Sequence, residues 1–185
     1  MSIFRQFAEM PNDSRLKTII VALLLCLVCS VLVSTAAVAL KPKQEANKAL
    51  DKKQNILRIA GMMRPGATVD ELFAEIEARV VDMETGEFAD DIDPLEYDQR
   101  KAAKDPAMSV KLSKDEDKAS IGRREKYASV YLVREGDQLK TIILPVHGYG
   151  LWSTMYGFVA LEGDARTVKG LGFYEHAETP GLGGE

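Results

Sequence analysis

Cysteine is nearly absent from this chain of 185 residues, and the two that occur, Cys26 and Cys29, both lie in an apolar segment. The polar remainder therefore has no disulfide and no thiolate metal site. The Cys-x-x-Cys spacing is open to a redox or metal interpretation. The simpler interpretation is two small apolar residues on a helix that faces lipid.

Catalytic signatures are also missing. The sequence has no nucleophile–base–acid constellation, no P-loop and no dinucleotide-binding fingerprint, so we expect no catalytic residue of its own. The only histidines are His147 and His176, and only Glu175 and Glu178 lie near enough to complete a metal site, so we expect no metal. A net charge of −4 argues against a nucleic-acid partner, because phosphate binding favours a basic surface.

One long apolar run is present. Residues 18–40 contain 23 residues without a charged side chain. As a helix this run would be about 34 Å long, enough to cross the ~30 Å hydrocarbon core of a bilayer. The sequence therefore predicts one transmembrane helix over Thr18–Leu40 with lipid around it.

Two questions about this segment stay open on the residues alone. Ala37-Val38-Ala39 also fits the cleavage site of a signal peptide, although the apolar run exceeds the usual length of such a leader. Lysines are more frequent after the run than before it, which by simple charge counting would place the C-terminal part in the cytoplasm. That rule is weak for long translocated domains.

After the apolar run the pattern predicts helices first. Residues 44–60 have helical periodicity, with Pro42 inviting a kink before them and Gly61 ending them. Thr68 and Glu71 form a capping box, which predicts a helix from Val69 to about Ala78. An extended stretch over 79–82 follows. Residues 90–112 are polar and irregular except for a short helix over 97–104, and a second capping box at Ser113 opens one or two helical turns.

From Tyr127 onward the period changes to that of strands. Residues 128–134 and 139–146 flank the turn 135–138, and residues 155–161 and 167–174 flank the turn 162–165, which predicts two hairpins. Four strands preceded by helices predict an α+β domain with an antiparallel sheet.

Two segments contain more glycine, aromatic and polar residues than a plain connection requires, namely residues 144–157 and 174–185. Closely placed glycines let a backbone approach a planar ligand, and Trp152 and Leu182 would cover its apolar face. Glycine-rich turns that cap a sheet would have the same composition. Within the second segment, Thr179 followed by Pro180 predicts a helix N-terminus, which would offer free amides to an electron-rich ligand edge.

The same segments carry a resemblance to a known family. Leu-Pro-Val-His-Gly-Tyr-Gly-Leu-Trp-Ser-Thr-Met-Tyr-Gly (144–157), His-Ala-Glu-Thr-Pro-Gly-Leu-Gly-Gly-Glu (176–185) and Tyr-Asp-Gln-Arg-Lys-Ala-Ala-Lys (97–104) closely resemble the C subunit of the bacterial sodium-translocating NADH:quinone oxidoreductases. The likeness runs from about Lys17 to the last residue. Gly-Leu-Trp-Ser-x-Met-Tyr distinguishes this family from the related G-subunit family of electron-transport complexes.

The resemblance implies a membrane-anchored flavin subunit. It would belong to a complex of six subunits that passes electrons from NADH to ubiquinone and exports Na⁺. Its FMN would be joined by a phosphoester to a threonine. The flavin contacts that can be carried over are Trp152, Glu178, Thr179, Leu182 and Gly183. Residues 1–17 would be a cytoplasmic tail, 18–40 the span, 41–62 a juxtamembrane helix and 63–185 a periplasmic FMN-binding domain at the bacterial inner membrane.

The chain departs from the family in one respect. The attachment threonine lies in a Ser-Gly-Ala-Thr-x-Thr type of segment, which this sequence does not contain. The resemblance therefore implies a C-terminally incomplete chain, with the attachment residue beyond Glu185. The alternative function for the chain as given is a non-catalytic, membrane-anchored domain that supports assembly or binds a partner.

Overall fold

The structure, a computed structural model, describes residue 11 and residues 14–184. Most of the expected cytoplasmic tail, residues 1–17, lies outside the described residues, as does Glu185. The chain divides into two compact units, Met1–Lys48 and Ala49–Glu185.

Helix α2 (Arg15–Ile59) contains the whole apolar run and continues through Pro42. Every residue from 21 to 48 is exposed, and the helix is long and apolar enough to cross a membrane. The expected juxtamembrane helix, residues 41–62, is the C-terminal part of α2 as far as Ile59. Gly61 ends it as expected, since its φ of +70° lets the Met62 amide turn back to the Leu57 carbonyl at 2.8 Å.

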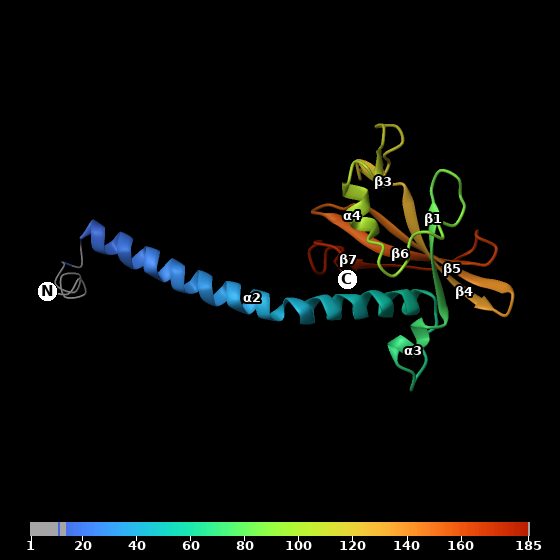
Figure 1. The fold of residues 1–185 in the computed structure, drawn as a ribbon, viewed down its shortest axis with the longest axis horizontal. Helices are drawn as coiled ribbons and strands as arrows, with labels where there is room; N and C mark the ends of the chain where they lie inside the picture. The colour runs from blue at the N-terminus through green and yellow to red at the C-terminus, as the bar shows by residue number, and fades with distance from the viewer. Residues whose placement is uncertain (1–10, 12–13, 185) are drawn as a thin grey trace. The chain divides into compact units, whose positions relative to one another are not determined.

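The second unit is built on a five-stranded antiparallel sheet in the order β1-β4-β5-β6-β7 (Figure 1). Its strands are β1 (Ile76–Asp82), β4 (Tyr127–Glu135), β5 (Gln138–Tyr149), β6 (Thr154–Glu162) and β7 (Val168–Glu175). The last turns of α2 pack on one face of it. There Ile56 and Leu57, both fully buried, join Tyr131, Ile143 and Phe158 in the core. The expected α+β class with an antiparallel sheet is confirmed.

The first helix after α2 is shorter than predicted. The capping box of Thr68 and Glu71 forms, but α3 covers only Val69–Phe73, and Ile76 already begins β1. The helix expected to reach Ala78 is therefore wrong beyond Phe73. Ile76, Ala78 and Val80 also alternate with the period of a strand, and antiparallel pairing with β4 decides between the two patterns.

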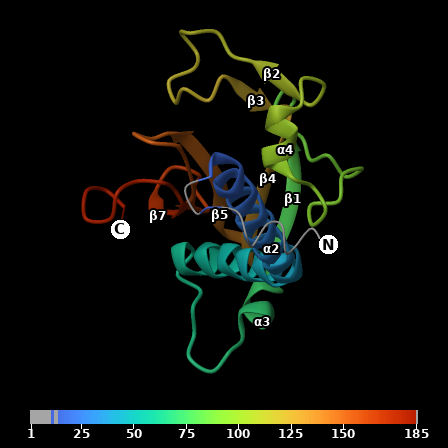
Figure 2. The same ribbon diagram turned by 90° about the vertical axis from the view of Figure 1, so that its left-hand side faces the viewer.

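Between β1 and β4 the chain forms a second, two-stranded sheet that was not predicted. Its strands are β2 (Ser109–Lys111) and β3 (Arg123–Glu125), which lie beside α4 (Gln99–Lys104) in Figure 2. The α4 helix was predicted and starts at an Asp98 N-cap. At Ser113 the chain makes a turn rather than the predicted helical turn, although the Glu116 carboxylate does accept from the Ser113 amide and hydroxyl.

Both predicted hairpins form. The β4–β5 turn is centred on Gly136, with φ of +60°, and the β6–β7 turn on residues 163–167. The predicted four-stranded sheet is wrong by one strand, because β1 pairs with β4 and makes it five.

Candidate functional site

The two glycine-bearing segments leave the sheet at the same end. β5 runs into residues 150–153, which return as β6, and β7 runs antiparallel to β6 into residues 176–184 (Figure 1). The hairpin turns lie at the opposite end. Antiparallel pairing therefore brings together two segments that are more than 20 residues apart in the sequence.

Two groups of hydrogen bonds join the segments directly. Oε1 of Glu178 accepts from the backbone amide of Leu151 at 2.9 Å and from that of Trp152 at 3.3 Å. The amide of Ala177 donates to the Ser153 hydroxyl at 3.1 Å. Leu151 and Ser153 were not among the predicted site residues, although both belong to the Gly-Leu-Trp-Ser-x-Met-Tyr motif that carries the resemblance. The structure thus places Trp152 next to Glu178, as one site would require.

Gly150 explains part of the glycine content. A Cβ at this position would lie 2.4 Å from the Glu178 carboxylate oxygen and 3.1 Å from the Ser153 carbonyl oxygen. The Gly150 amide closes the turn on that same carbonyl at 2.8 Å. Only glycine leaves room for the carboxylate to reach the amides of the loop.

The segment after β7 is a turn, so the helix predicted to begin at Thr179 is wrong. The Thr179 carbonyl accepts from the amides of Leu182 at 3.0 Å and Gly184 at 3.2 Å. Gly181 and Gly183 have φ of +79° and +123°, which a right-handed helix does not accommodate. Thr179, Leu182 and Gly183 therefore share one tight turn that begins beside Glu178.

Large apolar side chains at this end of the sheet are open to solvent. Leu151 is 76%, Trp152 64% and Leu182 83% exposed. Exposed apolar groups around joined polar loops are typical of a surface that a ligand or partner covers. By contrast, Glu178 is half-buried, because its carboxylate is directed into the neighbouring loop.

The two histidines differ in their surroundings. His147 stacks on Tyr156 with ring centroids 5.7 Å apart. His176 begins the second segment, and its Nδ1 is buried without a hydrogen-bond partner among the described residues. A buried ring nitrogen without a partner is costly, so a bound group that pairs with it would be favoured.

Arg100, on α4, reaches the same end of the sheet. Its guanidinium donates to Glu175 and to the Tyr174 hydroxyl, each at 2.8 Å. Burial alone would lower the pKa of Arg100, but the Glu175 and Tyr174 contacts outweigh it and hold the pKa above its ordinary value. Arg100 is therefore a fixed positive charge beside the last residue of β7.

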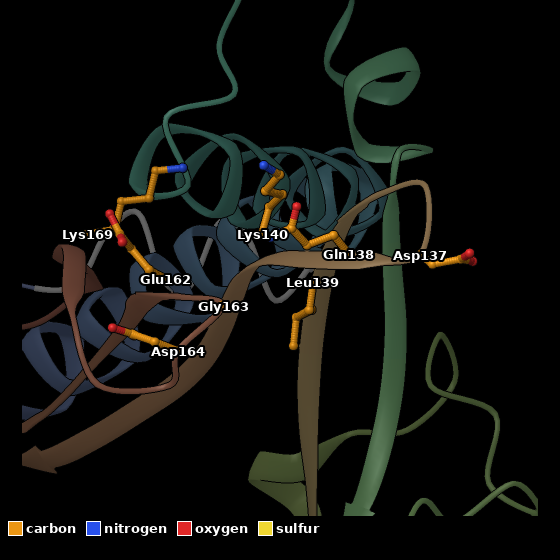
Figure 3. Close-up of a pocket in the computed structure, with 8 residues that line it drawn as sticks. All are labelled: Asp137, Gln138, Leu139, Lys140, Glu162, Gly163, Asp164 and Lys169. Carbon is orange, nitrogen blue, oxygen red and sulfur yellow. The ribbon is translucent and has the colours of Figure 1, made fainter.

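A polar cavity of about 820 Å³ lies at the other end of the sheet, lined by residues 137–140, 162–164 and Lys169. Figure 3 shows Lys140 and Lys169 on the same side of the strands, with Asp137 directed away from them. Because it lies between the hairpin turns, this cavity forms no wall of the candidate site.

The residues at the loop end suit a flat, partly apolar cofactor. Exposed Leu151, Trp152 and Leu182 offer apolar contact, and the glycine-bearing turn that carries Leu182 offers backbone groups. Comparison with known families agrees, since a family model described as an FMN-binding domain matches residues 150–185. The matched range contains both joined loops.

Relatives that align with most of the chain show which family it belongs to. The C subunit of the Na⁺-translocating NADH-quinone reductase from Pseudomonas aeruginosa is 58% identical over 178 residues, which cover 94% of this chain and 68% of that protein. The chain belongs to this C-subunit family. The C subunit from Vibrio campbellii is 55% identical over 179 residues, with 94% of this chain and 69% of that protein covered.

Solved structures from the same family share the fold. The crystal structure of NqrC from Shewanella oneidensis matches with a TM-score of 0.66 and 34% identity, covering 73% of this chain and 63% of that one. The C subunit from Parabacteroides distasonis matches with a TM-score of 0.55 and 26% identity, covering 76% of this chain and 60% of that one. The chain thus spans about two thirds of the length of its C-subunit relatives.

The family and the matched model establish three points. The chain belongs to the C-subunit family of a multi-subunit NADH-quinone reductase, FMN is the cofactor that the matched model supports, and α2 carries an apolar segment suited to membrane anchoring. These agree with the resemblance noted in the sequence. The individual flavin contacts and the mode of attachment are proposals.

Proposed function

We propose that this chain is the anchored part of an electron-carrying flavin subunit, which relays electrons within a complex that passes them from NADH to ubiquinone. The observation that carries the proposal is the contact between Glu178 and the amides of Leu151 and Trp152. It makes one surface out of the two loops that the FMN-binding family model covers.

The five expected flavin contacts take different roles on this surface. Trp152 and Leu182 supply apolar area for the ring, since both are more than half exposed. Thr179 and Gly183 belong to the turn after β7, whose backbone would approach the ring edge. Glu178 shapes the site, because one of its carboxylate oxygens is already occupied by two backbone amides.

FMN, when bound, supplies the electron chemistry, and the chain's residues bind it, orient it and limit its contact with water. We further propose that FMN is attached by a phosphoester to a threonine that follows Glu185 in the complete subunit. A covalent link would retain the cofactor on a surface that is otherwise open. Na⁺ transport belongs to other subunits, because residues 18–40 contain no ionisable side chain besides the two cysteine thiols.

The proposal includes an orientation. The N-terminus is cytoplasmic, residues 18–40 cross the bacterial inner membrane within its lipid, and the C-terminal domain is periplasmic in a complex of six subunits. A phosphatase reporter fused after Glu185 should be active, since such reporters fold only outside the cytoplasm. Activity of a cytoplasm-dependent reporter at the same position would instead support simple charge counting.

The flavin proposal is tested with the complete gene. The frame downstream of Glu185 should encode a Ser-Gly-Ala-Thr-x-Thr type of segment, and the subunit should give a fluorescent band on a denaturing gel under ultraviolet light. Substituting the candidate threonine by valine should remove the fluorescence without removing the protein band. A dark band from the unaltered subunit, purified with its complex, would favour the non-catalytic assembly role.

A further inference from the structure

The segment 97–104 contributes no residue to the expected flavin contacts, yet its side chains reach three distant places. Tyr97 donates its hydroxyl proton to the Tyr127 carbonyl at 2.7 Å. The Gln99 side-chain oxygen accepts from the Ser129 amide at 3.0 Å. Arg100 reaches furthest along the chain, to Glu175, 75 residues away. The first two contacts fix α4 on β4, and the third extends from this fixed base to β7.

The Arg100 guanidinium contacts the end of the β6–β7 ladder, on both strands. Its two terminal nitrogens donate to Glu175 and to the Tyr174 hydroxyl, each at 2.8 Å. Its central carbon lies 3.6 Å from the centroid of the Tyr156 ring and 5.3 Å from that of Tyr174. Such a planar group over an aromatic ring with a directed fork of donors is a geometry that lysine does not reproduce.

Strand pairing is disrupted at this same end of the ladder. Tyr156 pairs with Glu175 and Gly157 with Phe173, so Tyr174 is an extra residue on β7. A bulge leaves its extra residue without ladder hydrogen bonds and bends the strand. Arg100 holds the side chains of Tyr174, the extra residue, and of Glu175, the last residue of β7.

Glu175 is only three residues before Glu178. The direction in which β7 ends therefore determines whether the Glu178 carboxylate reaches the Leu151 amide. We propose that Arg100 is a positioning residue for the flavin-binding turn: by holding the bulged end of β7, it sets residues 176–184 against the loop 150–153. The flavin part of this inference rests on the proposed function, while the positioning of the two loops does not.

The test uses the complete subunit, with Arg100→Lys as the variant and Arg134→Lys as the matched control. Arg134 also pairs with a glutamate, Glu77 at 2.9 Å, but on the β1–β4 side of the sheet. Arg100→Lys keeps the positive charge but loses the planar guanidinium and its paired N–H donors. Amide hydrogen exchange is measured in the flavin-free subunit, together with the fluorescence anisotropy of Trp152, which is the only tryptophan in residues 1–185. Any tryptophan encoded beyond these residues is first replaced by phenylalanine.

With Arg100→Lys we expect exchange in residues 150–153 and 176–184 to accelerate about tenfold, since a half-exposed, charge-assisted contact is lost. The Trp152 anisotropy should fall, and exchange in β1 and β4 should stay unchanged. With Arg134→Lys the two loops should exchange as in the unaltered subunit. Unchanged loops in Arg100→Lys, or equal acceleration over the whole domain, would overturn the positioning role and leave only a general stabilising contact.

The effect of Arg100 on bound flavin is measured in a separate experiment. In the loaded subunit, Arg100→Lys should shift the midpoint potential of FMN, while Arg134→Lys should not. A missing flavin band in the unaltered subunit would refute the proposed function but leave the exchange result interpretable. A normal flavin band with an unshifted potential and unchanged loops would refute the role of Arg100 alone.

Discussion

Oε1 of Glu178 lies 2.9 Å from the backbone nitrogen of Leu151, across 27 residues of sequence. A carboxylate that accepts from backbone amides is stronger than a neutral acceptor in the same place. This contact joins the loop after β5 to the turn after β7, and the Ala177 amide adds a second link by donating to the Ser153 hydroxyl at 3.1 Å.

Removing the Glu178 side chain should weaken the junction of the loops. In Glu178→Ala we expect the Leu151 and Trp152 amides to exchange with solvent about fivefold faster, the equivalent of ~1 kcal/mol for one hydrogen bond. Glu178→Gln is the control, because its amide oxygen still accepts from both amides without the charge. An intermediate effect in Glu178→Gln is therefore expected, and unaltered exchange in Glu178→Ala would show that the contact does not hold the loops.

Close packing between α2 and β7 gives a second prediction. A Cβ at Gly170 would lie 2.7 Å from the Ile59 carbonyl oxygen, whereas one at Gly172 would lie 3.1 Å from the tip of the Ile59 side chain. Backbone cannot yield as a side chain can, so Gly170→Ala should lower the free energy of unfolding by about 1–3 kcal/mol. Gly172→Ala should change it by less than about 1 kcal/mol. Urea unfolding followed by circular dichroism measures both, and equal losses would contradict this distinction.

The predicted parts of the fold are those with a local signal. Alternating apolar residues around Gly136 and Gly163 specified both hairpins, and Thr68 with Glu71 specified where α3 begins. Neither signal gives the length of an element. Residues 76–80 fit a helical and an extended pattern equally, and only pairing with β4 selects the strand. Where α3 ends is thus determined by tertiary contacts and not by the local sequence.

Other parts had no local signal at all. β2 and β3 have three residues each and are rich in charge, and side-chain contacts such as Arg123 to Ser109 at 2.8 Å support them. Glycine and tryptophan content drew attention to the two candidate loops, but Ser153 and Arg100, which we propose hold them, act through contacts 24 and 75 residues away. A long-range contact of this kind leaves no periodicity in the sequence.

Tyr97 gives a pH-dependent prediction. Burial raises its pKa to about 12, with the Glu125 and Asp98 carboxylates adding to the effect. In the unfolded chain a tyrosine loses its proton near pH 10, so above that pH the unfolded state binds fewer protons than the folded one. The contribution of Tyr97 to the free energy of unfolding is therefore complete below about pH 10 and is lost as pH rises towards 12.

Comparison of the unfolding free energies of the unaltered chain and Tyr97→Phe from pH 8 to pH 11 measures this term. Tyr97→Phe should be less stable at pH 8 by about 1 kcal/mol, because the hydrogen bond to the Tyr127 carbonyl is lost. The difference in unfolding free energy between the unaltered chain and Tyr97→Phe should become smaller as pH rises above about 10. A constant difference would mean that Tyr97 titrates alike in both states.

The apolar part of α2 gives the last prediction. Its side chains are open, with Leu23 and Leu32 each 65% exposed, so its stability requires a surrounding apolar phase. Leu27→Arg, near the middle of the run, should raise the free energy of insertion by about 2.5–3.5 kcal/mol, whereas Thr18→Arg, at its end, should cost little, since a terminal arginine reaches the interface. The fraction of protein retained in carbonate-washed membranes measures both. If the intact mass of the extracted protein lacks residues 1–39, the run is a cleaved leader and the anchor assignment is wrong.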